Sequence, residues 1–154
     1  MVKQMKGSIN GSKLKIAIVV SRFNELVTTR LLEGCIDELI GFGVADKDIK
    51  VVWVPGSLEI PAVAKKVSNS RDIDAVICLG TVIRGATPHF DFVSSESVKG
   101  IAKIAQESKP PVVMGIITAD SFDQALDRAG LKEGNRGRDA ARYAIECVNL
   151  YKKL

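Results

Sequence analysis

The sequence predicts an α/β fold, a three-layer αβα sandwich whose middle layer is a four-stranded parallel sheet. The first observation is a set of four short runs rich in Val and Ile, bounded by turn residues, at residues 14–20, 49–54, 75–80 and 112–118. Continuous apolar runs of this length are typical of strands buried on both faces. The second observation is that segments of helical periodicity separate these runs. This alternation predicts right-handed crossovers between parallel strands, with helices on both faces of the sheet.

Five segments show the apolar spacing of three and four residues that is typical of an amphipathic helix. In chain order, their apolar positions are Val27, Leu31, Cys35, Leu39 and Phe42; Ile60, Val63, Ala64 and Val67; Val98, Ile101, Ala102 and Ala105; Phe122, Ala125, Leu126 and Ala129; and Ala141, Ala144, Ile145 and Val148. The third segment, residues 91–107, is less regular, and Pro110 predicts its end because proline interrupts a helix. Ser121 and Gln124 have the spacing of a capping box, which predicts that the fourth helix begins there.

The length and the even composition predict one domain. The chain has 154 residues and shows no internal repeat, low-complexity tract or linker. Residues 1–12 are polar and predict an N-terminal arm, which either lies on a neighbouring subunit or is loose. We therefore expect a single domain at residues 13–154 that follows this arm.

The composition also argues against several functional classes. The net charge is only +4 and aromatic residues make up 5%, which does not favour a nucleic-acid partner. No apolar run approaches the roughly 18 residues of a membrane span, and the first residues lack the apolar core of a secretion signal. The odd number of widely spaced cysteines predicts buried free thiols in a reducing, cytoplasmic setting rather than disulfides or a metal site. A catalytic cysteine would need a basic partner. The cysteines are Cys35, Cys78 and Cys147.

Ligands of an open parallel sheet bind beyond the carboxyl ends of its strands. In this chain, four loops follow the predicted strands, with the sequences SRFNE, PGSLEIP, GTVIRGATPHFD and TADS. These loops hold the only histidine of the chain, several Ser and Thr residues, a Phe and a carboxylate beside a proline. We therefore expect the chemistry of the protein at this edge of the sheet.

The third loop resembles a phosphate-binding loop. Its residues Gly80 to Thr87 follow a strand and precede a helix, where backbone amides and the helix dipole hold phosphate. The spacing nearly matches the nucleotide P-loop, but Ala86 stands where the P-loop has lysine. This argues against triphosphate hydrolysis and leaves two interpretations, a site for a single phosphoryl group or a tight turn.

Three loops carry residues with both a structural and a functional interpretation. His89 is either structural or a proton-transfer group, because an imidazole exchanges protons near neutral pH. Phe23 is either a core residue or a ring that stacks on a heteroaromatic substrate. Ser57 and Glu59 either cap and begin a helix that has Pro61 in its first turn or hold a polyhydroxyl chain.

A basic cluster follows the fourth predicted helix. A cluster of this kind is either a solvated face or an anion clamp, in which the planar fork of arginine suits a phosphate. Its cations are Arg128, Lys132, Arg136, Arg138 and Arg142, with Glu133 and Asp139 interspersed.

Five strings together carry a resemblance to a known family. They are GTVIRGATPHFDFV, SRFN, PGSLEIP, GIITAD and RAG followed by GNRG. In this order they resemble the lumazine synthases of riboflavin biosynthesis, from about Lys13 to the C-terminus. The resemblance implies a flavodoxin-like fold and a transferase that condenses 5-amino-6-(D-ribitylamino)uracil with 3,4-dihydroxy-2-butanone 4-phosphate. The products would be 6,7-dimethyl-8-ribityllumazine, phosphate and water, formed without a cofactor or a metal.

The resemblance also implies roles for individual residues. His89 would transfer protons, and Phe23 would stack on the pyrimidinedione ring. Arg128 of an adjacent subunit would close on the phosphate. The pyrimidine and ribityl side would further comprise Ser57, Leu58, Glu59, Thr81, Val82, Ile83 and Met114, and the phosphate side Ala86, Thr87 and Arg136. Met114 stands where the family often has Phe, which softens the wall facing the ring, and Arg136 stands where it usually has Lys.

Family members assemble as homopentamers, and some as hollow shells of twelve pentamers. The short link between RAG and GNRG favours the 60-subunit shell, and association with riboflavin synthase is a further expectation. A site shared between subunits makes the oligomer necessary for activity. Two rival interpretations are a flavodoxin-like module that binds flavin or lumazine without catalysis, and a structural cage with a vestigial pocket. The intact RGATPH block argues against both.

Overall fold

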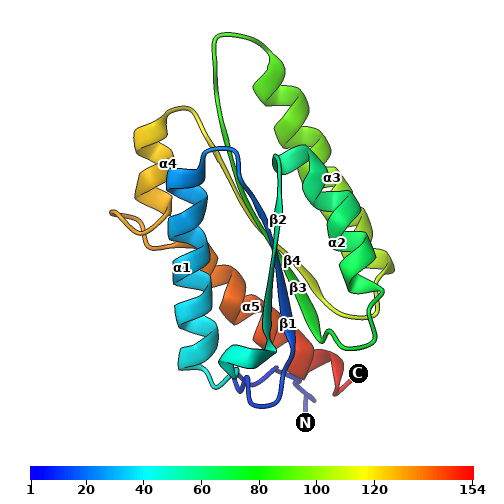
Figure 1. Cartoon of the computed structure of the whole chain (residues 1–154). Coiled ribbons are helices and arrows are strands. Elements are labelled where there is room, and N and C mark those ends of the chain that lie inside the picture. The colour runs from blue at the N-terminus through cyan, green and yellow to red at the C-terminus, as the bar shows by residue number, and fades with distance from the viewer.

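Figure 1 shows the computed structural model, which describes all residues 1–154. Its sheet consists of four parallel strands in the order β2-β1-β3-β4. The strands are β1 (Ile16–Ser21), β2 (Ile49–Val54), β3 (Ala75–Ile83) and β4 (Val112–Ala119). This order is that of a flavodoxin-like sheet. The predicted four-stranded parallel sheet is therefore confirmed.

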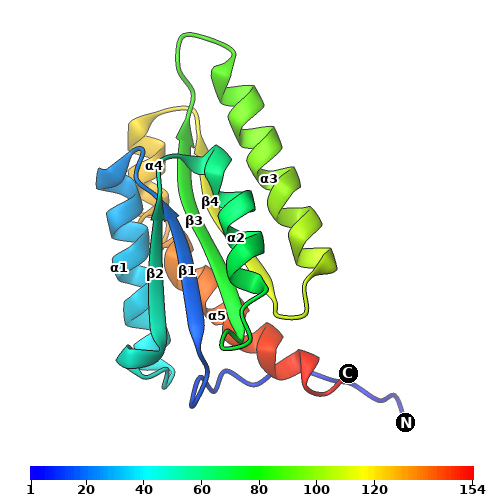
Figure 2. The ribbon, with the colours of Figure 1, turned by 45° about the vertical axis from the view of Figure 1, so that its right-hand side comes forward.

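Helices cover both faces of the sheet, as predicted (Figure 2). Helices α1 (Glu25–Gly41), α4 (Phe122–Arg128) and α5 (Arg136–Tyr151) pack on one face, and α2 (Ile60–Ser68) and α3 (His89–Glu107) on the other. Short 3-10 turns, η1 (Asp46–Asp48) and η2 (Ser57–Glu59), precede β2 and α2. None of the helices combines the length and the apolar character that crossing a membrane requires.

Each strand of the core contributes to two apolar clusters. On β1, Ile18 belongs to the cluster under α1 and α5, whereas its neighbour Val19 belongs to the cluster under α2 and α3. On β3, Ile77 belongs to the cluster under α1 and α5, and Val76 belongs to the cluster under α2 and α3. All four side chains are fully buried, and each such burial contributes about 1.5–3 kcal/mol. Burial on both faces is the reason that the strands appear in the sequence as continuous apolar runs.

The capping box at the start of α4 is confirmed in part. The Ser121 hydroxyl accepts a hydrogen bond from the backbone N–H of Gln124, at 3.2 Å. The side chain of Gln124 accepts its hydrogen bond from the N–H of Asp120, at 2.9 Å, and not from that of Ser121. The helix begins where the sequence predicts, with the second bond displaced by one residue.

The prediction that a loop begins at Gly80 is wrong, because β3 continues to Ile83. The register of β3 with β4 runs on from Gly80↔Ile116 to Ile83↔Ala119. By contrast, its register with β1 stops at Leu79. The edge of β3 that faces β1 therefore has no strand partner beyond Leu79. This open edge lies at the carboxyl end of the sheet.

The N-terminal arm runs along α5 without forming a helix or strand (Figure 2). The side-chain amide of Asn149 donates hydrogen bonds to the carbonyl oxygens of Ser8, at 2.8 Å, and Asn10, at 3.0 Å. Gly7 packs so closely on the backbone of Glu146 that a Cβ atom there would overlap it. Within the single chain, the arm is therefore bound and not loose.

Candidate active site

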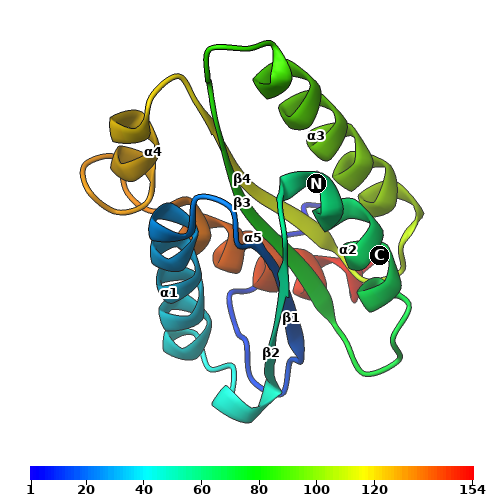
Figure 3. The same ribbon diagram turned by 45° about the horizontal axis from the view of Figure 1, so that its top comes forward.

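A cavity of about 340 Å³ lies at the carboxyl ends of β1, β2 and β3, between α3 and the loops that follow β1 and β2. The ribbon in Figure 3 shows how these elements are arranged. The cavity lies where the chain order reverses on either side of β1, the expected ligand position in such sheets. Its lining residues are Phe23, Asn24, Pro55, Gly56, Ser57, Leu58, Glu59, Thr81, Val82, Ile83, His89, Phe90 and Val93. They include His89 and all residues predicted for the pyrimidine and ribityl side except Met114.

The loop after β1 is tied to the loop after β2. The backbone N–H groups of Arg22 and Phe23 donate to the carbonyl oxygens of Val54, at 2.8 Å, and Pro55, at 3.0 Å. This backbone pairing leaves the Phe23 side chain 70% exposed at the cavity mouth. A side chain this exposed is not part of the core. Of the two interpretations from the sequence, the ring at a pocket mouth is the one that agrees with the structure.

Asn24 was missed by the sequence analysis as a cavity residue. Its backbone is left-handed, with φ 60° and ψ 47°, a conformation that asparagine tolerates better than most residues. Its side-chain amide donates to the carbonyl oxygen of Thr81 on the open edge of β3, at 3.1 Å. Asn24 therefore joins the first loop to the third strand at the floor of the cavity.

The open edge of β3 offers backbone groups to a ligand. Thr81, Val82 and Ile83 line the cavity, beyond the last residue of β3 that pairs with β1. Backbone N–H and C=O groups are strong hydrogen-bonding groups, and a planar ring with amide edges can pair with them as a strand does. Apart from the Thr81 carbonyl oxygen, which accepts from Asn24, this edge leaves backbone groups open to the cavity.

Residues 57–59 form the 3-10 turn η2 and not a side-chain cap. Neither η2 nor α2 has a side-chain hydrogen bond at its N-terminus, so the capping role considered for Ser57 and Glu59 is not observed. Ser57 is 5% exposed, and its hydroxyl has no hydrogen-bond partner. Leu58 and Glu59 are exposed along the cavity. This wall combines an unpartnered hydroxyl, a carboxylate and an apolar side chain.

His89 is the first residue of α3 and is exposed at the cavity. Arg84 anchors the loop before it: its Nε lies 2.8 Å from an oxygen of Asp120 and its Nη1 3.7 Å from one of Asp91. The Arg84 guanidinium also lies 4.5 Å from the ring centre of Phe90. The hydrogen bond to Asp120 raises the pKa of Arg84, so its charge is retained. Phe90 and Asp91, the two residues that follow His89, therefore both contact the guanidinium of Arg84.

The residues predicted for the phosphate do not line this cavity within one chain. Ala86 and Thr87 lie in the exposed loop between β3 and α3. Arg128 ends α4 and Arg136 begins α5, on the opposite face of the sheet from α2 and α3. Met114 also lies outside the cavity: it is 44% exposed on β4, in register with Cys78.

The basic cluster divides into paired and unpaired cations. Arg138 contacts Asp37 at 2.6 Å and Glu38 at 3.0 Å, and Arg142 contacts Glu38 at 2.8 Å. These pairs connect α5 to α1, and the hydrogen bonds to Asp37 and Glu38 raise the pKa of Arg138. Arg136 forms an exposed pair with Asp139, at 3.4 Å.

Arg128 and Lys132 form no salt bridge within the chain. The guanidinium of Arg128 reaches only the carbonyl oxygen of Gln124, at 3.5 Å. Arginine without a carboxylate partner keeps its forked donors available for an anion. Arg128 is therefore the member of the basic cluster that best suits an anion clamp.

The cysteines supply no nucleophile. Burial raises the pKa of the Cys35 and Cys78 thiols to about 12, so both are protonated at neutral pH. The prediction that Cys147 is buried is wrong, because this residue is only half-buried. Its partial burial raises the pKa of the thiol, and the negative charge of Glu146 raises it further. No group of three or more His, Cys, Asp or Glu side chains is arranged to hold a metal ion.

Four further lining residues were missed besides Asn24. Pro55 and Gly56 belong to the quoted string PGSLEIP, so their position in a carboxyl-edge loop was the available signal. Phe90 and Val93 follow His89 on the first turn of α3, where position i+4 lies on the same helix face as His89. The apolar part of the wall therefore follows from the point at which α3 begins.

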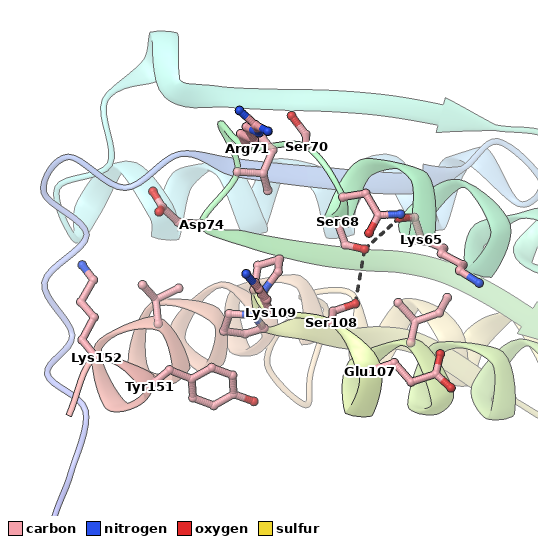
Figure 4. Close-up of a pocket in the computed structure, with 16 residues that line it drawn as sticks. Lys65, Ser68, Ser70, Arg71, Asp74, Glu107, Ser108, Lys109, Tyr151 and Lys152 are labelled. Atoms are coloured by element: carbon pink, nitrogen blue, oxygen red, sulfur yellow. Dashed lines mark hydrogen bonds between the residues drawn. The ribbon is translucent and has the colours of Figure 1, made fainter. Parts of the chain in front are cut away.

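A second, larger cavity of about 720 Å³ lies at the other end of the sheet, among the C-terminal ends of α2, α3 and α5 (Figure 4). Two of its hydroxyl groups are partnered: Ser68 donates to the carbonyl oxygen of Lys65, at 2.8 Å, and Ser108 donates to Ser68, at 3.3 Å. It contains none of the residues predicted for function.

The chain matches known proteins along nearly its whole length. The family model described as 6,7-dimethyl-8-ribityllumazine synthase matches residues 13–152. The chain belongs to the lumazine synthase family. It is 50% identical over 153 residues to the 6,7-dimethyl-8-ribityllumazine synthase of Protochlamydia amoebophila, covering 99% of this chain and 89% of that protein. The resemblance identified from the five strings is thereby confirmed.

Membership of the lumazine synthase family establishes the reaction class. The chain is an enzyme, a transferase of riboflavin biosynthesis that forms 6,7-dimethyl-8-ribityllumazine from the two substrates expected above. Lumazine synthase chemistry requires a planar ring, a polyol chain and a sugar phosphate to meet in one place. The cavity described here offers groups suited to the first two and, within one chain, no cation for the third.

Proposed function

We propose that the cavity at the carboxyl ends of β1–β3 binds both substrates of the lumazine synthase reaction. Phe23 stacks on the pyrimidinedione ring, and the backbone of Thr81, Val82 and Ile83 hydrogen-bonds its edge. Ser57, Leu58 and Glu59 line the ribityl chain. The observation that carries this proposal is the convergence in one cavity of an exposed ring, an open strand edge, an unpartnered hydroxyl and the only histidine.

His89 is the proton-transfer group of the proposed site. The substrate amine attacks the butanone carbonyl to give a Schiff base and water, and phosphate then leaves by elimination. The second nitrogen attacks the remaining carbonyl, which closes the ring with loss of a second water. Each step moves a proton near the amine or the enol, which is work for an imidazole. The exposed position of His89 at the start of α3, beside the cavity, supports this role. Orientation of two reactants in one pocket supplies much of the remaining catalysis.

The phosphate side of the site is formed by two subunits. Ala86 and Thr87 of one chain hold the phosphate through the exposed loop before α3, and Arg128 of an adjacent subunit closes on it. Met114 and Arg136 of that subunit complete the ring and phosphate walls. Two observations support the assignment of these residues to a second subunit. Met114, Arg128 and Arg136 all lie outside the cavity of their own chain, and Arg128 has no carboxylate partner there.

The assembly is a homopentamer, arranged further into a 60-subunit shell that associates with riboflavin synthase. The short link of three residues between Gly130 and Gly134, both of which are left-handed, supports the shell because it carries no insertion. Residues 13–154 form the single catalytic domain, and residues 1–12 are an arm. Three unpaired cysteines support a cytoplasmic location. Light scattering or electron microscopy of the purified protein tests the assembly.

The direct test of the proposed function is product formation. Purified protein incubated with 5-amino-6-(D-ribitylamino)uracil and 3,4-dihydroxy-2-butanone 4-phosphate should release one phosphate for each lumazine formed. Product is followed by absorbance and phosphate by a colorimetric assay. Binding of the pyrimidine without any product would instead support a flavodoxin-like binding module, and binding of neither would support a cage with a vestigial pocket.

A further inference from the structure

Two buried hydroxyl groups beneath the cavity have no hydrogen-bond partner. Ser21, the last residue of β1, is fully buried, and Ser57 at the start of η2 is 5% exposed. Neither hydroxyl forms a hydrogen bond within the chain. Because burial of an unsatisfied hydroxyl destabilises a protein, a buried hydroxyl without a partner in the chain requires a specific reason.

Both hydroxyls are directed at the same point. A Cβ atom on Gly80 would lie 2.7 Å from the Ser57 hydroxyl oxygen and 3.1 Å from that of Ser21. The same atom would lie 3.0 Å from Cδ1 of Ile60, an apolar neighbour that is itself fully buried. Glycine on β3 therefore leaves the space into which the two hydroxyls point. Hydrogen bonds formed in such low-dielectric surroundings are strengthened.

Only one of the two hydroxyls belongs to the cavity wall. Ser57 lines the cavity and Ser21 does not, so Ser21 can act on a ligand only through Ser57. The two hydroxyls are not hydrogen-bonded to each other in the chain alone, but a hydroxyl is one donor and two acceptors. Rotation of the Ser57 hydroxyl when a ligand binds would therefore allow one hydrogen bond with Ser21 and another with a ligand hydroxyl. The three atoms nearest this point are two hydroxyl oxygens and a methyl carbon, none of them charged, which suits an uncharged hydroxyl as the partner on the ligand.

We propose that Ser21 is a positioning residue that orients the Ser57 hydroxyl toward a hydroxyl group of the polyol chain of the pyrimidine substrate. This inference rests on the proposed function, in which the ribityl chain lies along Ser57. Ser21 and Ser57 form a polar pair that selects a hydroxylated chain over an apolar one, with Gly80 providing the space between them.

The test is a double-mutant cycle of Ser21→Ala and Ser57→Ala, with KM and kcat measured for each substrate. Each single variant should raise KM for the ribityl pyrimidine about tenfold, which is the loss of roughly one hydrogen bond in a buried site. KM for the butanone phosphate and kcat should stay within twofold. The double variant should resemble Ser57→Ala alone, because the two hydroxyls act as one unit.

The matched control is Ser97→Ala. Ser97 on α3 is also fully buried with an unpartnered hydroxyl, but it does not line the cavity. Ser97→Ala should leave both KM values unchanged. A second readout uses a pyrimidine that carries an unhydroxylated pentyl chain: wild type and Ser21→Ala should then bind it equally, since the hydroxyl that Ser57 recognises is gone.

The outcomes separate this inference from the proposed function. If Ser57→Ala raises KM and Ser21→Ala does not, the positioning role is wrong and the ribityl site stands. If Ser57→Ala has no effect, the ribityl assignment itself fails. A Ser21→Ala variant that raises both KM values equally, or that adds fully to Ser57→Ala, shows a structural role and also overturns the inference.

Discussion

The two cavities at opposite ends of the sheet differ in what their polar groups contact. The larger one, about 720 Å³, is lined by Ser68 and Ser108, whose hydroxyls are hydrogen-bonded within the chain. The smaller one, about 340 Å³, contains the unpartnered hydroxyls of Ser57 and Thr81. Folded proteins rarely leave buried polar groups unsatisfied. Cavity size is therefore a poorer guide to the active site here than unsatisfied hydrogen-bonding capacity.

The two cavities also differ in charge. Lys65, Arg71 and Lys152 of the larger cavity form no salt bridge, but their side chains extend in different directions (Figure 4). In the smaller cavity, the ionisable side chains are Glu59 and His89 alone. A site for a sugar phosphate needs a cation, and a single chain supplies none that lines this cavity. This difference supports the proposal made above that a neighbouring subunit supplies the positive charge.

The largest expected effect is that of His89→Ala, which removes the only imidazole from the smaller cavity. General acid–base catalysis contributes about 10²–10⁴-fold, so kcat should fall about a hundredfold or more, with residual turnover from substrate orientation. KM for the pyrimidine should change less than threefold, because the ring and ribityl contacts remain. Steady-state kinetics with both substrates measures these quantities.

The matched control for His89 is Ser95→Ala, an exposed position on α3 outside the cavity. Ser95→Ala should retain full turnover. Unaltered kcat in His89→Ala would remove His89 from the mechanism. Activity that disappears together with the cooperative thermal transition would instead indicate that the variant is unfolded, and a circular dichroism melt distinguishes the two.

The fold could be predicted because its central strands, β1 and β3, are buried on both sides and the outer strands are also apolar. The run at residues 49–54 coincides with β2, and α4 begins at the predicted capping box. The extension of β3 to Ile83 could not be predicted, because Gly80 is typical of a turn and only the pairing with β4 keeps the chain extended there. Strand ends are decided by partners that are distant in sequence.

Those residues of the site could be predicted whose role follows from their residue type and from their position in a loop. Phe23 and His89 follow from the rule that ligands bind beyond the carboxyl ends of the strands. Asn24 was missed because its contribution depends on a left-handed backbone and a hydrogen bond to Thr81, 57 residues away. The buried state of Ser21 and its proximity to Ser57 depend on the packing of η2 against β1 and β3, which no local pattern records.

A smaller effect is expected for Arg128→Ala, which tests whether the smaller cavity borrows its cation. Hydrogen bonds to charged groups contribute about 1.5–3 kcal/mol, so KM for the butanone phosphate should rise about 10- to 100-fold. KM for the pyrimidine should change little. Equal effects on both substrates would contradict a phosphate role for Arg128.

Mixed assemblies sharpen this test because His89 and Arg128 are proposed to act from different subunits. Neither variant alone is fully active, but co-refolded His89→Ala and Arg128→Ala chains should contain some sites in which both native residues meet. Turnover above the average of the two pure variants is expected. Arg142→Ala is the control, since Arg142 already pairs with Glu38 within its chain and should leave KM unchanged. A mixture no more active than that average would argue for a site within one chain.

The smallest effects are expected at the larger cavity, where the polar groups already have partners or face solvent. Arg71→Ala and Lys109→Ala alter exposed side chains and should change the free energy of unfolding by less than about 0.5 kcal/mol. Ser68→Ala removes a hydrogen bond to Lys65 and one from Ser108, and should destabilise by about 1 kcal/mol. All three should keep kcat and both KM values within twofold, measured beside urea unfolding. A tenfold loss of activity in a variant of unchanged stability would show that the larger cavity takes part in the reaction. Unsatisfied hydroxyl groups would then no longer distinguish the reactive end of the sheet from the other end.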